Sequence, residues 1–96
     1  MPAYAVAQLS IHNPERYDRY VEAFPPVIER YGGRVLAADN DPDVLEGRWD
    51  YDRFVLLEFP DRASLEAWAT SPEYREIVRD RVAASHGVVL YVRGLP

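Results

Sequence analysis

Two short stretches of the chain repeat one pattern, HNPERYDRY from His12 to Tyr20 and TSPEYREI from Thr70 to Ile77. In both, Asn or Ser is followed by Pro-Glu and then by tyrosine. A short side-chain oxygen can accept a hydrogen bond from a free N–H of the first helical turn. Proline is tolerated at the first helical position, and a glutamate there faces the positive end of the helix dipole. Each stretch is therefore predicted to begin a helix.

The first helix is predicted to run from Pro14 to Tyr31, where YGG ends it. Pro25 and Pro26 remove two backbone hydrogen bonds, so a kink or a restart is expected near Phe24. The apolar residues that share one face of this helix are Tyr17, Tyr20, Val21, Phe24, Ile28 and Tyr31.

The second helical region is predicted to begin earlier than its motif, with Asp61 as the cap, and to break at Pro72 into two short helices. It should end at the turn-like SHG of Ser85 to Gly87. Its apolar stripe comprises Leu65, Trp68, Ala69, Tyr74, Ile77, Val78 and Val82.

Strands are predicted between the helices, because runs rich in β-branched and aromatic residues are bounded there by turn residues. Three such runs are Ala3–Ile11, Arg53–Phe59 and Val88–Arg93. Two more, Arg34–Asp39 and Asp43–Trp49, flank the turn signal NDP and would form a hairpin or one long bulged strand.

The order βαββαβ predicts an α+β fold of the ferredoxin-like plan, with an antiparallel sheet and both helical regions on one face. Alternation divides the side chains between the two faces. The helix side is expected to hold Ala3, Ala5, Ala7, Leu9, Ile11, Val55, Leu57, Phe59, Val88, Leu90 and Val92. The open side is expected to hold Tyr4, Val6, Gln8, Ser10, Phe54, Leu56, Glu58, Val89, Tyr91 and Arg93. Because this open face is half apolar and rich in aromatics, we predict a homodimer through it.

Length and composition narrow the function classes. Ninety-six residues suit a single domain, residues 1–96. No apolar run approaches the roughly 20 residues of a membrane span, and the N-terminus lacks the basic flank of a secretory signal. With no cysteine, the chain is expected to be cytoplasmic. Its net charge of −5, with arginines interleaved among acids, argues against binding nucleic acid.

Candidate catalytic residues are His12, His86 and Glu46. The ferredoxin-like order brings His12 and His86 to one rim of the sheet, with Trp49, Tyr51 and Asp52 near it. Two imidazoles and a carboxylate could bind a metal or relay a proton; alternatively both histidines are solvated loop residues. No metal-ligand spacing is present, so no metal and no cofactor are predicted.

Two glutamates lie within otherwise apolar strands. Glu58 is expected to form an ion pair with Arg48 or Arg93 of either chain; alternatively it is exposed at an edge, or lies in a cavity as a general acid or base. Glu46 precedes Gly47, whose missing side chain leaves space for a ligand, so Glu46 is a candidate ligand contact.

Four aromatic residues on the helix stripes, Tyr17, Tyr20, Trp68 and Tyr74, are either core or the lining of a pocket. Facing alanines on the first strand would leave room for a pocket that is apolar with a few polar groups. Together with Glu46, these four would line a site for a small apolar or aromatic metabolite.

The chain resembles the bacterial domain of unknown function 1330, within the dimeric α/β-barrel superfamily. The resemblance rests on YDRY, YGGRVL, VLEG, VLLEFPDRASLEAW and SPEYREI, which span nearly the whole chain. It implies a ferredoxin-like monomer whose sheets pair into a barrel, and it implies no particular reaction. Relatives in the superfamily include cofactor-free monooxygenases, isomerases and haem enzymes. A metabolite-binding protein, or a cofactor-independent monooxygenase- or isomerase-like enzyme, is therefore expected, with a non-catalytic homodimeric binding or assembly module as the alternative.

Overall fold

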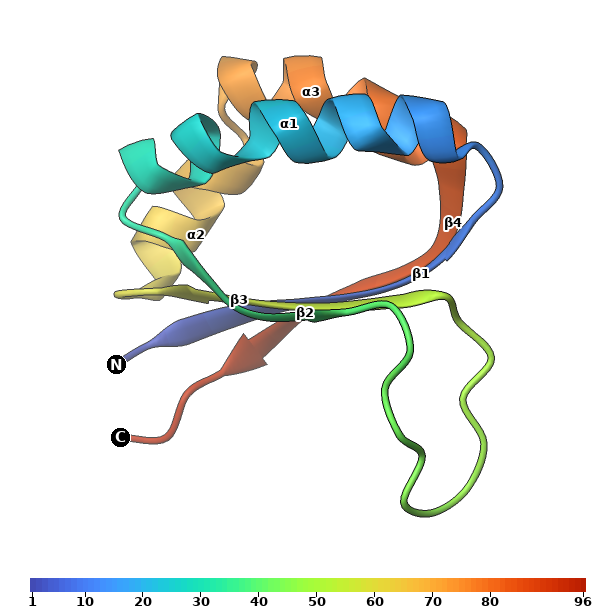
Figure 1. The fold of residues 1–96 in the computed structure, drawn as a ribbon. Coiled ribbons are helices and arrows are strands. Elements are labelled where there is room, and N and C mark those ends of the chain that lie inside the picture. The colour runs from blue at the N-terminus through green and yellow to red at the C-terminus, as the bar shows by residue number, and fades with distance from the viewer.

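The computed structural model describes all 96 residues. Three helices cover one face of a four-stranded sheet (Figure 1). The helices are α1 (Pro14–Arg30), α2 (Arg62–Ala69) and α3 (Pro72–Ala84), and the strands are β1 (Ala3–Ile11), β2 (Arg34–Asp39), β3 (Arg53–Phe59) and β4 (Ser85–Arg93). The strand order is β2-β3-β1-β4, with every pairing antiparallel. The predicted ferredoxin-like α+β fold is confirmed.

The predicted helix starts are also confirmed. The side chain of Asn13 accepts a hydrogen bond from the N–H of Arg16, and that of Ser71 accepts one from the N–H of Tyr74. Asp61 caps α2 in the same way, through the N–H of Ser64. Thr70 and Ser71 separate α2 from α3, as the break at Pro72 predicted.

Of the kink or restart predicted near Phe24, the restart is wrong, because α1 runs continuously through Pro25 and Pro26. In a regular helix these prolines would leave the carbonyl groups of Val21 and Glu22 without their partners. All four residues are exposed. Water can therefore bind the two freed carbonyls, and the cost of the prolines stays small enough for the helix to continue.

The predicted strand Asp43–Trp49 is also wrong. Residues 40–52 form a loop that extends from the sheet on the side away from the helices (Figure 1). Gly47 has a φ of 87°, which is outside the extended region of a strand. The alternative, one long bulged strand through both runs, is wrong as well; the register shift that does occur lies inside β2, between Val35 and Ala37.

The two faces of β4 are the reverse of the prediction. The register pairs Ala5 with Tyr91 and Ala7 with Val89, so Val89 and Tyr91 lie on the helix side. Val88, Leu90 and Val92 lie opposite Gln8, Val6 and Tyr4 on the open face. Both alternate sets of this strand are apolar, and such a strand does not reveal its inward face by alternation.

The start of β4 explains its register. Strand β4 follows α3 without a turn, so Ser85, His86 and Gly87 are strand residues rather than a loop. Figure 1 shows β4 bending down from the helix layer into the sheet. At this bend Gly87 has a φ of 155°, and a Cβ there would overlap the carbonyl oxygen of Gln8. Glycine is therefore required where the strand enters the sheet.

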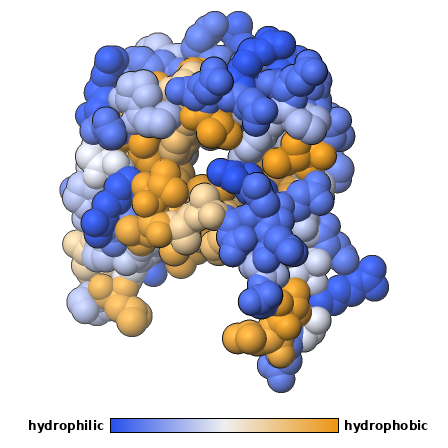
Figure 2. Space-filling model, viewed as in Figure 1, coloured by the Kyte–Doolittle hydropathy of each residue, from blue (hydrophilic) through white to orange (hydrophobic).

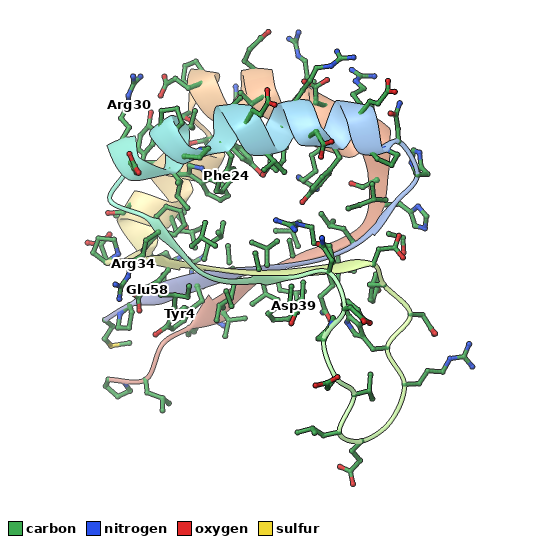
Figure 3. All side chains as sticks on the ribbon, in the orientation of Figure 1. Tyr4, Phe24, Arg30, Arg34, Asp39 and Glu58 are labelled. Atoms are coloured by element: carbon green, nitrogen blue, oxygen red, sulfur yellow. The ribbon has the colours of Figure 1, made fainter.

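The hydrophobic core lies between the two layers, and Figure 3 shows Phe24 of α1 pointing toward the sheet. Its buried members are Ala3, Ala5, Leu9, Leu57 and Phe59 from the sheet and Tyr17, Tyr20, Phe24, Ile28, Leu65, Trp68, Tyr74 and Ala84 from the helices. Val82, predicted to belong to this stripe, is instead 63% exposed. None of the helices has the length and apolar character needed to cross a membrane.

Candidate functional site

A cavity of about 170 Å³ lies between the helices and the sheet. Figure 2 shows an opening into the molecule between these two layers. Of the 15 lining residues, 13 are hydrophobic, which makes the cavity suited to an apolar guest. The lining consists of Ala5, Ala7, Tyr17, Tyr20, Val21, Phe24, Pro25, Val35, Ala38, Arg53, Val55, Leu57, Trp68, Tyr74 and Val89.

The cavity exists because small side chains on the sheet face large rings on the helices. Ala5 and Ala7 of β1 and Ala38 of β2 supply the floor. Trp68 of α2 and Tyr74 of α3 pack against each other, with ring centroids 4.2 Å apart. These rings hold one another in place, and the alanines below are too short to fill the remaining space.

The tyrosine hydroxyls are the first polar groups of this site. Those of Tyr20 and Tyr74 lie 3.2 Å apart, in hydrogen-bond contact. Burial raises the pKa of Tyr20 well above its ordinary value, and the neighbouring Tyr74 raises it further. Burial also raises the pKa of Tyr17, against a smaller lowering by Arg53. The hydroxyls of Tyr17 and Tyr20 are therefore neutral hydrogen-bonding groups at physiological pH.

Arg53 is the one charged residue that lines the cavity. Its guanidinium carbon lies 5.6 Å from the ring centroid of Tyr17, and its Nη1 donates to Asn40 Oδ1 over 2.7 Å. The buried Nε of Arg53 has no hydrogen-bond partner. Sequence reasoning missed this residue, because an arginine at the first position of a strand carries no motif.

Arg53 lies at the outer end of the cavity. A surface hollow adjoins the cavity there and shares Tyr17, Val21 and Arg53 with it. Asp18 and Asp52 line the outer part of this hollow. A ligand that enters from this side would pass the guanidinium group before it reaches the aromatic rings.

Four of the five predicted ligand-binding residues, Tyr17, Tyr20, Trp68 and Tyr74, line this one cavity. The fifth, Glu46, does not. Glu46 lies exposed on the loop of residues 40–52 and borders a different, shallow hollow with Trp49 and Gln8. The space beside Gly47 is open solvent rather than a ligand pocket, since a Cβ there would meet no atom within 4 Å.

The structure brings His12 and His86 together at one end of the sheet. Their rings are stacked, with centroids 5.9 Å apart and an angle of 21° between the planes. The backbone N–H of Ile11 donates to Asp52 Oδ2 over 2.7 Å, so this carboxylate is engaged beside them. Both histidines are exposed, and neither lines the cavity. No group of three or more His, Cys, Asp or Glu side chains could hold a metal ion.

Glu58 forms an ion pair, but its partner differs from the prediction. Arg34 of the neighbouring strand β2 contacts Glu58 Oε1 with Nη2 at 2.8 Å and with Nε at 2.9 Å. Figure 3 shows Arg34 and Glu58 at the same end of the sheet. The pairing of β2 with β3 sets Arg34 directly opposite Glu58, which decides the choice of partner.

A family model described as a domain of unknown function, DUF1330, matches residues 2–95. The chain belongs to this family. The family match agrees with the fold and leaves the activity open, as the description of DUF1330 says. Among the curated proteins, none matches the chain.

Solved structures of similar fold include a protein of unknown function from Rhodopseudomonas palustris. Its sequence is 25% identical to that of this DUF1330 chain. The match covers 99% of this chain and 83% of the Rhodopseudomonas palustris chain, with a TM-score of 0.82. A dimeric ferredoxin-like protein of unknown function from Thermobifida fusca is 15% identical; the match covers 96% of this chain and 90% of that one, with a TM-score of 0.70. SnoaB, a cofactor-independent oxygenase from Streptomyces nogalater, is 11% identical; the match covers 99% of this chain and 94% of SnoaB, with a TM-score of 0.68.

Proposed function

We propose that the protein is a homodimer that binds a small apolar or aromatic metabolite in the cavity between its helices and its sheet. The cavity itself carries this proposal. It is apolar, it holds a few convergent polar groups, and its volume of about 170 Å³ suits a single substituted ring. An engineered apolar cavity of about 150 Å³ in another protein binds benzene.

Binding, rather than catalysis by proton abstraction, is what the lining supports. Its titratable groups are Arg53 and three tyrosines, and it contains no carboxylate or imidazole that could act as a base. The catalytic candidates Glu46, His12 and His86 lie outside it. SnoaB shares the fold with this chain at 11% identity, which supports the architecture and not a shared reaction.

The dimer is proposed from the open face of the sheet. Seven apolar side chains gather there and are half-buried or exposed, namely Tyr4, Val6, Phe54, Leu56, Val88, Leu90 and Val92. The loop of residues 40–52 extends from the same side, and its Leu45 is 97% exposed. A second copy would bury both the face and the loop residue. The Thermobifida fusca protein of this fold is described as dimeric, which agrees with the proposal.

A charge placed on the open face tests the dimer. Leu90→Glu should convert the protein to a folded monomer of 11.0 kDa, because a carboxylate cannot be buried there unpaired. Val82→Glu is the matched control, since Val82 is an exposed apolar residue of α3 and lies outside the sheet. Sedimentation velocity measures the oligomeric state of both variants and of the wild-type protein. A monomeric wild-type protein, or a dimeric Leu90→Glu protein, would reject the proposed interface.

Tryptophan fluorescence tests the binding. In a Trp49→Phe protein the only tryptophan is Trp68, which lines the cavity, so toluene, benzyl alcohol and p-cresol should change its emission in a saturable way. In a Trp68→Phe protein the remaining Trp49 should not respond. Native mass spectrometry of the wild-type protein should show the subunit number and any co-purified small molecule. No saturable response to any probe, and no bound molecule, would reject the cavity as a binding site.

A further inference from the structure

We infer that the bound molecule is a small aromatic acid, whose carboxylate contacts Arg53 at the outer end of the cavity while its ring lies among the aromatic side chains. This inference rests on the proposed binding function and specifies the chemistry of the ligand. Three features of the lining lead to it: the unpaired hydrogen-bonding groups, the distribution of charge, and the position of Arg53.

The unpaired buried groups around the cavity are all donors. Three buried side-chain nitrogens lack a hydrogen-bond partner: Nε of Arg53, Nε1 of Trp68 and Nε of Arg81. No buried side-chain oxygen is unpaired. Arg53 and Trp68 line the cavity, and the guanidinium carbon of Arg81 lies 6.0 Å from the ring centroid of Tyr20, which also lines it. Because an unpaired buried donor is costly, a small shift of these side chains toward a guest that carries acceptor oxygens would be favourable.

The charges agree with the donors. The chain has a net charge of −5, and six of its eleven basic residues, all arginines, form ion pairs with carboxylates. Arg53 and Arg81 are not among the six. Asp18 and Asp52 border the outer hollow beside Arg53, but neither forms an ion pair with it. An acidic protein thus keeps two positive charges beside this apolar cavity without a carboxylate partner.

The position of Arg53 decides how the ligand would be oriented. One amino group of its guanidinium, Nη1, donates to Asn40, and the positive charge of the group has no carboxylate partner. A carboxylate at this point would receive a charge-assisted hydrogen bond, which is stronger than a neutral one. The ring would then extend inward, over Ala5 and Ala7 and beneath Tyr20 and Trp68, into the apolar part of the lining.

Benzoate and nitrobenzene test this inference, because the two molecules have nearly the same shape and only benzoate is charged. The wild-type protein should bind benzoate about tenfold or more tightly than nitrobenzene, as a charge-assisted hydrogen bond would give. Arg53→Met should abolish that preference, because benzoate binding should weaken far more than nitrobenzene binding. Arg75→Met, which removes an exposed arginine of α3 that forms no ion pair, is the control and should keep the preference. Calorimetric titration, with ligand-observed NMR for weak binding, gives the affinities.

The outcomes separate the two proposals. Nitrobenzene bound as tightly as benzoate, or a benzoate preference that survives in Arg53→Met, would overturn the aromatic-acid inference and leave the apolar binding site standing. Failure of both probes to bind would overturn both. If Arg53→Met does not fold by circular dichroism, Arg53→Lys keeps a charge but loses the planar guanidinium group, and the inference then requires a weaker benzoate preference than in the wild-type protein.

Discussion

The hydroxyl oxygens of Tyr20 and Tyr74 lie 3.2 Å apart and join α1 to α3 within the wall of the cavity. Both side chains are buried, at 8% and 7% exposure. Their rings meet edge to face, with centroids 6.4 Å apart. This contact ties the two longest helices together at the point where they cover the apolar space, so it links the stability of the fold to the shape of the site.

The two hydroxyls of this pair should be energetically coupled: the losses of stability in the two single variants should sum to more than the loss in the double variant. Tyr20→Phe or Tyr74→Phe leaves a buried hydroxyl unpaired, which we expect to cost about 1–3 kcal/mol. The double variant leaves none unpaired, so its loss should be smaller than the sum of the two single losses. Urea unfolding of all four proteins measures the coupling. Strictly additive losses would show that the two hydroxyls do not interact.

Alkaline pH should destabilise the fold. In the unfolded chain Tyr20 ionises at a pH of about 10, whereas burial raises its pKa in the folded state. Above that pH the folded state holds more protons than the unfolded state, so the free energy of unfolding falls until the raised pKa is reached. The decline should be shallower in Tyr20→Phe than in Tyr51→Phe, which alters a tyrosine of the loop. Urea unfolding between pH 8 and 11 measures both slopes, and equal slopes would contradict the assignment to Tyr20.

Filling the cavity should abolish binding at little cost to the fold. Ala7 lines the empty space, so Ala7→Leu has room for its added carbons and should change the free energy of unfolding by less than about 1 kcal/mol. Ala3 lies on the same strand and face but is 1% exposed and does not line the cavity. Ala3→Leu should therefore cost about 1–3 kcal/mol. Urea unfolding and a toluene titration of both variants check this, and equal destabilisation would mean that the space beside Ala7 is already filled.

The two repeated helix starts should differ in their energetic importance. Ser71 is 4% exposed; its hydroxyl accepts from the N–H of Tyr74 and donates to the carbonyl of Trp68. Ser71→Ala should thus cost about 1–2 kcal/mol and should also weaken the binding of p-cresol, because both neighbours line the cavity. Asn13 is exposed, so Asn13→Ala should cost about 0.5–1 kcal/mol and leave binding unchanged. Urea unfolding with a p-cresol titration distinguishes them, and equal effects of both variants on binding would contradict this account.

Local signals in the sequence were sufficient for the helix starts and the strand order, but they wrongly predicted a strand over Asp43–Trp49. Asn13, Ser71 and Asp61 each mark a helix start through a short-range hydrogen bond, which depends on few other residues. Local signals could not predict which face of β4 points toward the helices, because Val88–Val92 is apolar on both faces. That choice is set where the strand enters the sheet at Gly87.

The candidate site was predictable in part for the same reason. Tyr17, Tyr20, Trp68 and Tyr74 fall on helix faces that point inward, so their common location follows from helical periodicity. Glu46 was proposed from its neighbour Gly47, and that glycine proved to shape an exposed loop. Arg53 gained its place at the cavity from tertiary packing against Tyr17 of another element, and no pattern along the chain encodes that contact.

The cavity beneath Trp68 also affects how the protein responds to pressure. A cavity that the protein's own atoms leave unfilled is lost when the chain unfolds, so the folded form occupies the larger volume of the two and compression favours unfolding. High hydrostatic pressure should therefore open the wild-type protein more readily than Ala7→Leu, and a guest molecule that occupies the cavity should confer the same resistance without any change in covalent structure.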